Sequence, residues 1–147
     1  MSPRTLRPVG YTLVETLITL TVIALVLGAA LPAIKHGFDR IATRGAASDA
    51  AAAFFVARAS AVASARQTIV RIDTTGRISV LSSRGDTLMT RDLARLHRTA
   101  VAATRREMIY STVGLGYAGA NLRLVFTRGR AADTVVVSRE GRVRRGR

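Results

Sequence analysis

Residues 10–34 read GYTLVETLITLTVIALVLGAALPAI, and this stretch decides the fold class. Residues 16–34 carry no charge, and Val, Leu, Ile, Ala and Thr dominate them. A bilayer core of about 30 Å needs about 20 apolar residues in a helix, so the stretch is just long enough to span a membrane. Its one charge, Glu15, lies at the start of the apolar run.

A secretory signal peptide is the first alternative to a membrane helix. Its apolar core should be about 7 to 15 residues long, followed by a small-residue cleavage site. The core here is longer, although its small residues leave an Ala-x-Ala cut after Ala30 open. Glu15 argues against a signal peptide, because a carboxylate at the bilayer centre costs roughly 2.5–3.5 kcal/mol. Either Glu15 lies in the headgroup layer, or an interaction repays that cost.

The first 34 residues resemble the N-terminal signal of type IV prepilins and pseudopilins. The shared features are a short basic leader, the motif GYTLVE at residues 10–15, a long apolar helix and Pro32 within it. Tyr11 replaces the commoner Phe, and Thr16 replaces the commoner Leu.

The resemblance implies that a prepilin peptidase cuts between Gly10 and Tyr11 and methylates the new amine of Tyr11. It also implies that Glu15 serves assembly by meeting the N-terminal amine of a neighbouring subunit. Opposite charges attract far more strongly at low dielectric than in water, so such a pair would relieve the penalty on Glu15. The implied partners are other pilin or pseudopilin subunits and an inner-membrane assembly platform, with the bulk of the chain in the periplasm.

The resemblance and the composition together predict one folded domain behind a leader and an anchor. The expected parts are a leader (1–10), a transmembrane and polymerisation helix (11–34), its amphipathic continuation (35–66) and an antiparallel β domain (67–147). Pro32 predicts a bend in a continuous helix; the alternative is that the first helix stops near Leu31. Arg4 and Arg7 favour a cytoplasmic N-terminus, but basic residues also follow the apolar run, so charge alone does not fix the topology.

The composition excludes some chemistry and favours anionic partners. The 147 residues contain no Cys, so no disulfide, thiolate metal site or Cys nucleophile exists. The net charge is +14, and Lys35 is the only Lys among 23 basic residues. Such a chain is drawn to polyanions, although Arg and Ala richness also follows from a GC-rich genome.

Residues 35–66 are rich in Ala and predict an amphipathic helix that docks on a sheet. At about 100° per residue, one apolar stripe forms. Its members are Phe38, Ile41, Ala42, Gly45, Ala52, Val56, Ala59 and Ala63. Phe54 and Phe55 lie off this stripe and fit either a wider core or contacts with other subunits.

From Gln67 the period changes to that of β-strands. Residues 68–73 and 77–81 predict a hairpin, and residues 82–86 the next turn. Further strands are expected at 106–113, 121–128, 133–138 and 142–145, with a Gly-rich loop at 114–119. Residues 87–106 stay ambiguous, because DLARLHR fits either a helical turn or a strand.

The second half resembles the GspH/FimT group of minor pseudopilins and pilins. The resemblance depends on the helix end at residues 57–61 (ARASA), the hairpin, the Gly-rich loop and the terminal Gly-Arg-Val-Arg. The resemblance implies an α+β, type IV pilin-like fold, with one N-terminal helix packed against a small antiparallel β-sheet domain.

No catalytic constellation is evident, and we expect neither an enzyme nor a cofactor or metal. His36 and His97 are far apart in the chain, and we expect both to lie on the protein surface. GLGYAG precedes a predicted strand rather than a helix, so a turn is favoured over a phosphate loop. The RGD tripeptide at 84–86 predicts a plain turn rather than an adhesion site.

The basic tail offers a second class of function. Residues 123–147 contain eight Arg and two acidic residues, a net of +6. Arg142 and Arg144 should project from one face of a strand, with Arg145 beside them, and Arg fits phosphate bidentately. Some FimT-like pilins serve DNA uptake through a terminal G-R-x-R, which Gly141, Arg142 and Arg144 match; a solubilising tail is the alternative. The sequence thus predicts a minor pseudopilin or pilin, or a filament-borne DNA receptor, or a plain anchored periplasmic domain.

Overall fold

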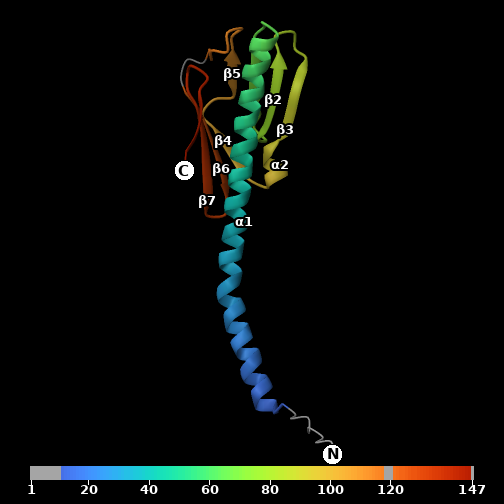
Figure 1. Cartoon of the computed structure of the whole chain (residues 1–147), viewed down its shortest axis with the longest axis vertical. Helices are drawn as coiled ribbons and strands as arrows, with labels where there is room; N and C mark the ends of the chain where they lie inside the picture. The colour runs from blue at the N-terminus through green and yellow to red at the C-terminus, as the bar shows by residue number, and fades with distance from the viewer. Residues whose placement is uncertain (1–10, 118–120, 147) are drawn as a thin grey trace, which may run out of the picture. The chain divides into compact units, whose positions relative to one another are not determined.

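The computed structural model describes residues 11–117 and 121–146. Within these residues, one long helix, α1 (Leu13–Ala63), is followed by eight strands and one short helix, α2 (Leu93–His97) (Figure 1). The chain divides into two compact units, with His36–Arg147 as the second.

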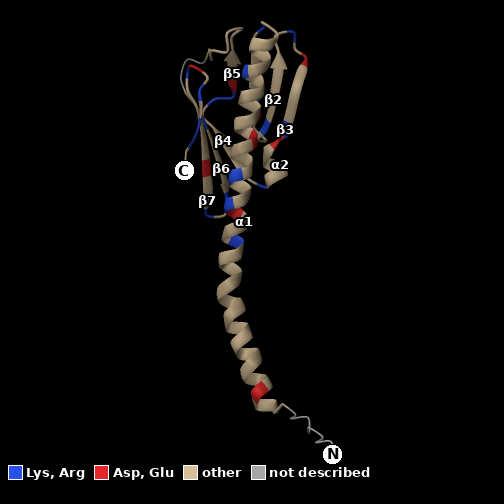
Figure 2. Cartoon of the chain, in the orientation of Figure 1, with Lys and Arg blue, Asp and Glu red and all other residues tan. Residues whose placement is uncertain are grey.

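The first unit contains the apolar part of α1. The helix passes through Pro32 without interruption, so a helix that stops near Leu31 is the wrong alternative. The segment is long and apolar enough to cross a membrane, and the side chains of its most apolar stretch are unburied. Between Glu15 and Lys35 it carries no charge (Figure 2). A bend at Pro32 stays a prediction.

The second unit holds two antiparallel sheets, whereas the sequence predicted a small β domain without dividing its strands. The first sheet has the order β3-β2-β1-β5, from β1 (Thr68–Ile72), β2 (Arg77–Ser82), β3 (Thr87–Asp92) and β5 (Glu107–Tyr110). The second has the order β4-β6-β7-β8, from β4 (Ala100–Ala103), β6 (Leu122–Arg128), β7 (Ala131–Val137) and β8 (Val143–Gly146). The C-terminal part of α1 lies alongside both sheets (Figure 1).

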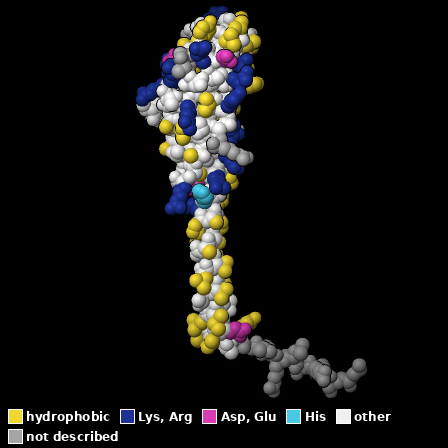
Figure 3. Space-filling model, turned by 90° about the vertical axis from the view of Figure 1, so that its left-hand side faces the viewer, with side chains coloured by type: hydrophobic (Ala, Val, Ile, Leu, Met, Phe, Trp, Pro, Cys, Tyr) yellow, Lys and Arg dark blue, Asp and Glu magenta, His cyan; other side chains and the backbone are white. Residues whose placement is uncertain are grey.

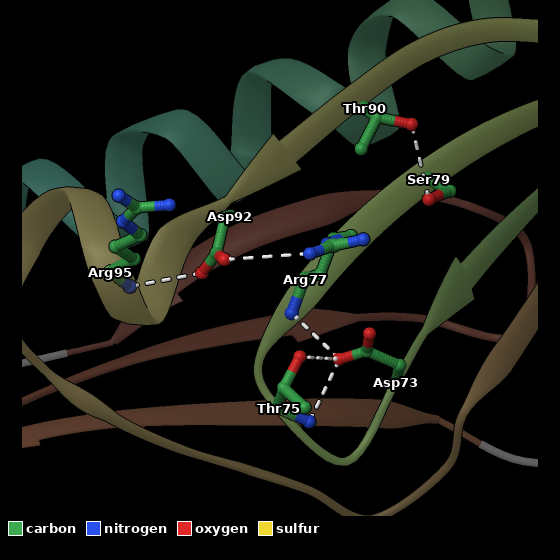
Figure 4. Close-up of polar contacts among 7 residues, drawn as sticks. All are labelled: Asp73, Thr75, Arg77, Ser79, Thr90, Asp92 and Arg95. Atoms are coloured by element: carbon green, nitrogen blue, oxygen red, sulfur yellow. Dashed lines mark hydrogen bonds and ion pairs between the residues drawn. The ribbon is translucent and has the colours of Figure 1, made fainter.

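Local turn chemistry explains why the first hairpin forms where the sequence predicts it. Asp73 Oδ1 accepts hydrogen bonds from the Thr75 hydroxyl (2.6 Å), the Thr75 amide (2.8 Å) and the Arg77 amide (2.9 Å) (Figure 4). These bonds, with the Thr75 hydroxyl first, lower the pKa of Asp73 from 3.8. Gly76 supplies a φ of 84°, which a residue with a Cβ rarely adopts. The RGD tripeptide likewise lies in a turn, between β2 and β3.

The predicted apolar stripe on α1 is wrong. Phe38 and Ile41 are 63% and 66% exposed, and Ala52, Val56, Ala59 and Ala63 also face solvent. The buried face consists mainly of Ala. Its members are Asp39, Thr43, Ala46, Ala47, Ala50, Ala53, Phe54, Ala57 and Ala61. Small side chains let the helix backbone approach the sheets closely, so the bulkier residues are left on the outer face.

One hydrophobic core joins this Ala face to both sheets. The strands contribute large buried side chains such as Ile72, Ile78, Met108, Leu124 and Phe126. Ala57 and Ala61, the first and last Ala of the ARASA helix end, are both fully buried, whereas Ala59 between them is exposed. The adjacent Phe54 and Phe55 separate, because Phe54 is buried and Phe55 is 71% exposed.

The ambiguous residues 87–106 form a strand, a helix and another strand. DLARLHR becomes α2, because Asp92 caps it by accepting a hydrogen bond from the Arg95 amide. The predicted strand at 106–113 is shorter than expected and ends at Tyr110. Part of the predicted loop at 114–119 lies outside the described residues.

Candidate functional site

The first candidate site is the N-terminal end of α1. Gly10 lies outside the described residues, and Tyr11 is 83% exposed. Thr12 Oγ1 accepts a hydrogen bond from the Glu15 amide at 3.2 Å. Thr12 therefore caps the helix, and Glu15 lies in its first turn.

This geometry gives the TLVE motif a structural meaning that the sequence reading missed. Ser or Thr followed three residues later by Glu or Gln is the capping-box pattern, which satisfies unpaired amides at a helix start. A negative charge in the first turn is also favourable to the helix dipole. Glu15 thus lies at a position where its charge favours the helix end, and the assembly role stays what the resemblance implies.

The second candidate site is the hairpin between β7 and β8, residues 138–145, which we call the arginine hairpin. The Gly141 amide donates to the Ser138 carbonyl at 2.8 Å, and the Ser138 amide donates to the Arg142 carbonyl at 2.8 Å. The Arg142 amide also donates to Ser138 Oγ at 3.0 Å. These bonds fix the backbone from which the arginines project.

Gly141 is required by both conformation and space. Its φ is 83°, and a Cβ at this position would lie 2.6 Å from Cε1 of Tyr110. The Tyr110 side chain is fully buried, and its hydroxyl donates to the Gly141 carbonyl at 3.4 Å. Burial raises the pKa of Tyr110 to about 12. The glycine of the G-R-x-R motif is therefore where the hairpin packs on the core.

The arginines of this hairpin do not act as one group. Arg142 and Arg144 line the same shallow hollow of about 280 Å³, together with Arg139. Asn121, Ser138 and Glu140 complete its lining. Arg145 instead approaches Asp133 at 3.5 Å and donates to the Arg44 carbonyl at 3.2 Å.

The expectation that His97 is a surface residue is wrong. Its side chain is 19% exposed, and its Nε2 lies 2.8 Å from Asp49 Oδ2 on α1. Gly45 makes room for the ring, because a Cβ there would lie 2.8 Å from His97 Cε1. Asp49 and His97 are 48 positions apart, so no sequence pattern pointed to this pair. His36 is half-buried.

Arg side chains are spread over the face of the second unit that Figure 3 shows. The described residues contain no group of three or more His, Cys, Asp or Glu that could hold a metal ion.

A long N-terminal helix on a small antiparallel domain is the fold of type IV pilin-like proteins. Two crystal structures of the type IV minor pilin FimU from Pseudomonas aeruginosa match with TM-scores of 0.60 and 0.58 and identities of 15% and 14%. Both matches cover 71% of this chain, and 88% and 92% of the respective FimU chains. The minor pseudopilin EpsH from the type 2 secretion system of Vibrio cholerae matches with a TM-score of 0.56 and 16% identity. That match covers 70% of this chain and 94% of EpsH.

Models of known protein families and curated protein sequences give no match to this chain. The predicted α+β, pilin-like fold is confirmed. At these identities the likeness concerns the fold.

Proposed function

We propose that the chain is a minor pilin or minor pseudopilin that assembles into a filament through its N-terminal helix. The observation that carries the proposal is one continuous helix with two different environments. Its first part exposes large apolar side chains, including Leu17, Leu25 and Leu31 at 55%, 70% and 61%. Its later part is the spine of a domain with the pilin-like fold. Exposing such a large apolar surface to water is unfavourable, so lipid or other subunits must cover it.

Maturation follows from the GYTLVE motif. A prepilin peptidase removes residues 1–10 and methylates the amine of Tyr11. Before assembly the protein resides in the inner membrane with residues 36–147 in the periplasm. An assembly platform then inserts it among other subunits. The resemblance fits both a type II secretion pseudopilus and a related type IV pilus.

The intact mass of the protein purified from its host membranes tests this maturation. Loss of residues 1–10 with one added methyl group is expected. Gly10→Val should block the cut, because the peptidase needs a small residue there. A full-length chain would leave a plain membrane anchor, and a cut near Ala30 would indicate an exported domain without a filament role.

The role of Glu15 in assembly is separable from its role at the helix cap. Glu15→Gln keeps a residue that suits a capping box but removes the charge that would pair with the neighbouring amine. Glu15→Leu removes both. We expect both variants to insert into the membrane and to be cleaved, but to be lost from sheared filaments. Normal incorporation of Glu15→Gln would show that the charge pair is not needed.

DNA binding by the arginine hairpin is the second candidate function. It is favoured by the shared hollow of Arg139, Arg142 and Arg144, since guanidinium groups bind phosphate bidentately. Arg145 is engaged with Asp133, so it contributes less.

Binding to duplex DNA across a salt series tests the second candidate. Replacing Arg142 and Arg144 with Ala should lower the affinity and reduce the salt slope by about 2, because each lost phosphate contact removes about 0.9. Arg145→Ala is the matched control and should change the slope less. An unchanged slope in the double variant would exclude DNA binding at this hairpin.

A further inference from the structure

A second basic surface lies away from the arginine hairpin, where β3 passes into α2. Arg91, Asp92, Arg95, Leu96 and Arg98 line a groove of about 590 Å³, which we call the α2 groove. Its charges come from three guanidinium groups and one carboxylate. Neither filament assembly nor DNA binding by the arginine hairpin uses this groove.

Two of the three guanidinium groups remain available to a ligand. Arg91 lies 3.8 Å from Asp49 Oδ1. Asp92 is paired with Arg77 at 3.8 Å, as Figure 4 shows. Asp92 also accepts the Arg95 backbone amide at 3.0 Å, but it forms no ion pair with the Arg95 guanidinium. Within the described part of the chain, Arg95 and Arg98 make no ion pair, and both are exposed. An anion entering the groove would therefore find uncommitted donors.

Arg98 occupies a position where the backbone favours glycine. It follows the last turn of α2 with φ 52° and ψ 48°, and its amide donates to the Ala94 carbonyl. Helices that end in this way usually place Gly there, because a Cβ is strained in the left-handed region. The Arg98 side chain occupies this strained position and makes no ion pair within the described residues, which points to a ligand outside the domain.

The groove also offers an apolar contact. Leu96 is 62% exposed between Arg95 and Arg98 along α2 and its cap. Arg around an apolar anchor is typical of protein interfaces. A nucleic-acid strand would favour aromatic platforms, and the groove lining contains none.

We propose that the α2 groove binds an acidic segment of a protein partner, with Arg95 and Arg98 pairing its carboxylates and Leu96 covering an apolar side chain. The partner is a different chain rather than a second copy, because this protein carries a net charge of +14 and repels itself. The inference rests on the groove alone and does not require the filament role.

Fluorescence anisotropy tests this with the full chain in uncharged detergent micelles. The probe is a fluorescein-labelled peptide of alternating Glu and Leu, and its counterpart has Gln in place of Glu. Binding of the Glu peptide only is expected. Arg98→Gly and Arg95→Gln should each weaken it about tenfold, the loss of one charge-assisted hydrogen bond. The control, Arg142→Gln with Arg144→Gln, should bind as the wild type does.

Arg98→Gly separates binding from folding, because it should keep or raise the melting temperature while affinity falls. Equal binding of the Gln peptide would overturn the proposal. Loss of binding only in the Arg142 and Arg144 variant would place the peptide on the arginine hairpin instead. If the groove variants weaken binding of a short single-stranded DNA but not of the peptide, the groove is a nucleic-acid site and the proposal is wrong.

Discussion

Asp39 and Arg128 form an ion pair in which Asp39 Oδ1 lies 2.9 Å from Arg128 Nε. Asp39 is only 7% exposed, and it lies near the start of the second unit on α1. Arg128 ends β6 and also donates to the His97 carbonyl at 3.1 Å. One guanidinium thus connects α1, the second sheet and the end of α2.

Removing the acid from this pair should destabilise the second unit. Asp39→Ala leaves Arg128 without its carboxylate, and we expect the free energy of unfolding to fall by about 1–3 kcal/mol. The exposed edge of Arg128 keeps the loss below that of a fully buried pair. Denaturant unfolding of the full chain in uncharged detergent measures it.

The double variant Asp39→Ala with Arg128→Ala completes a double-mutant cycle, which measures the coupling between the two side chains. If the pair is coupled, the two losses will not add, and the double variant will be more stable than the sum predicts. Strict additivity would show that the two side chains act independently.

Two helical glycines of α1 should respond in opposite directions to alanine. A Cβ on Gly45 would lie 2.8 Å from the His97 ring, whereas one on Gly37 meets nothing within 4 Å. Gly37→Ala should stabilise the protein by up to about 1 kcal/mol through helix propensity. Gly45→Ala should lower the melting temperature, because the ring must leave Asp49. A gain in stability from Gly45→Ala would contradict the packing of His97 against the helix.

The neighbouring residues Phe54 and Phe55 provide a matched pair for folding and assembly. Phe54→Ala should cost about 3–5 kcal/mol, since Phe54 is fully buried in the core. Phe55→Ala should change stability by less than about 0.5 kcal/mol, because Phe55 is 71% exposed. If α1 packs against other subunits, Phe55→Ala will reduce incorporation into filaments. Equal losses of stability in both variants would contradict the burial of Phe54 and the exposure of Phe55 on α1.

Tyr110 should make the protein sensitive to alkali. Burial raises its pKa from 10.0 to about 12, so the unfolded chain loses its phenolic proton before the folded chain does. Stability that is complete below pH 10 is therefore lost as the pH rises, by about 1.4 kcal/mol for each unit up to pH 12. Tyr110→Phe removes this contribution, so the free energy of unfolding of the variant should fall less steeply between pH 10 and pH 12. Parallel curves for the two proteins would exclude Tyr110 as the cause.

Features with local causes were predictable from the sequence. The apolar run, the hairpin at 68–81 and the turn at 82–86 depend on residues close together in the chain, such as Asp73, Thr75 and Gly76. The face of α1 that is buried was not predictable, because Ala is compatible with either face. Only the close approach of the two sheets selects Ala57 and Ala61 for the core and leaves Phe38 and Ile41 outside.

The long apolar helix and the β domain after it could be read from the chain, since hydrophobicity and periodicity are properties of neighbouring residues. Which charges remain free depends instead on the folded structure. Arg145 approaches Asp133, Arg91 approaches Asp49, and Arg95 and Arg98 have no such partner within the described residues. Charge count is fixed by composition, but pairing depends on which strands and helices meet, and those contacts join residues far apart in the chain.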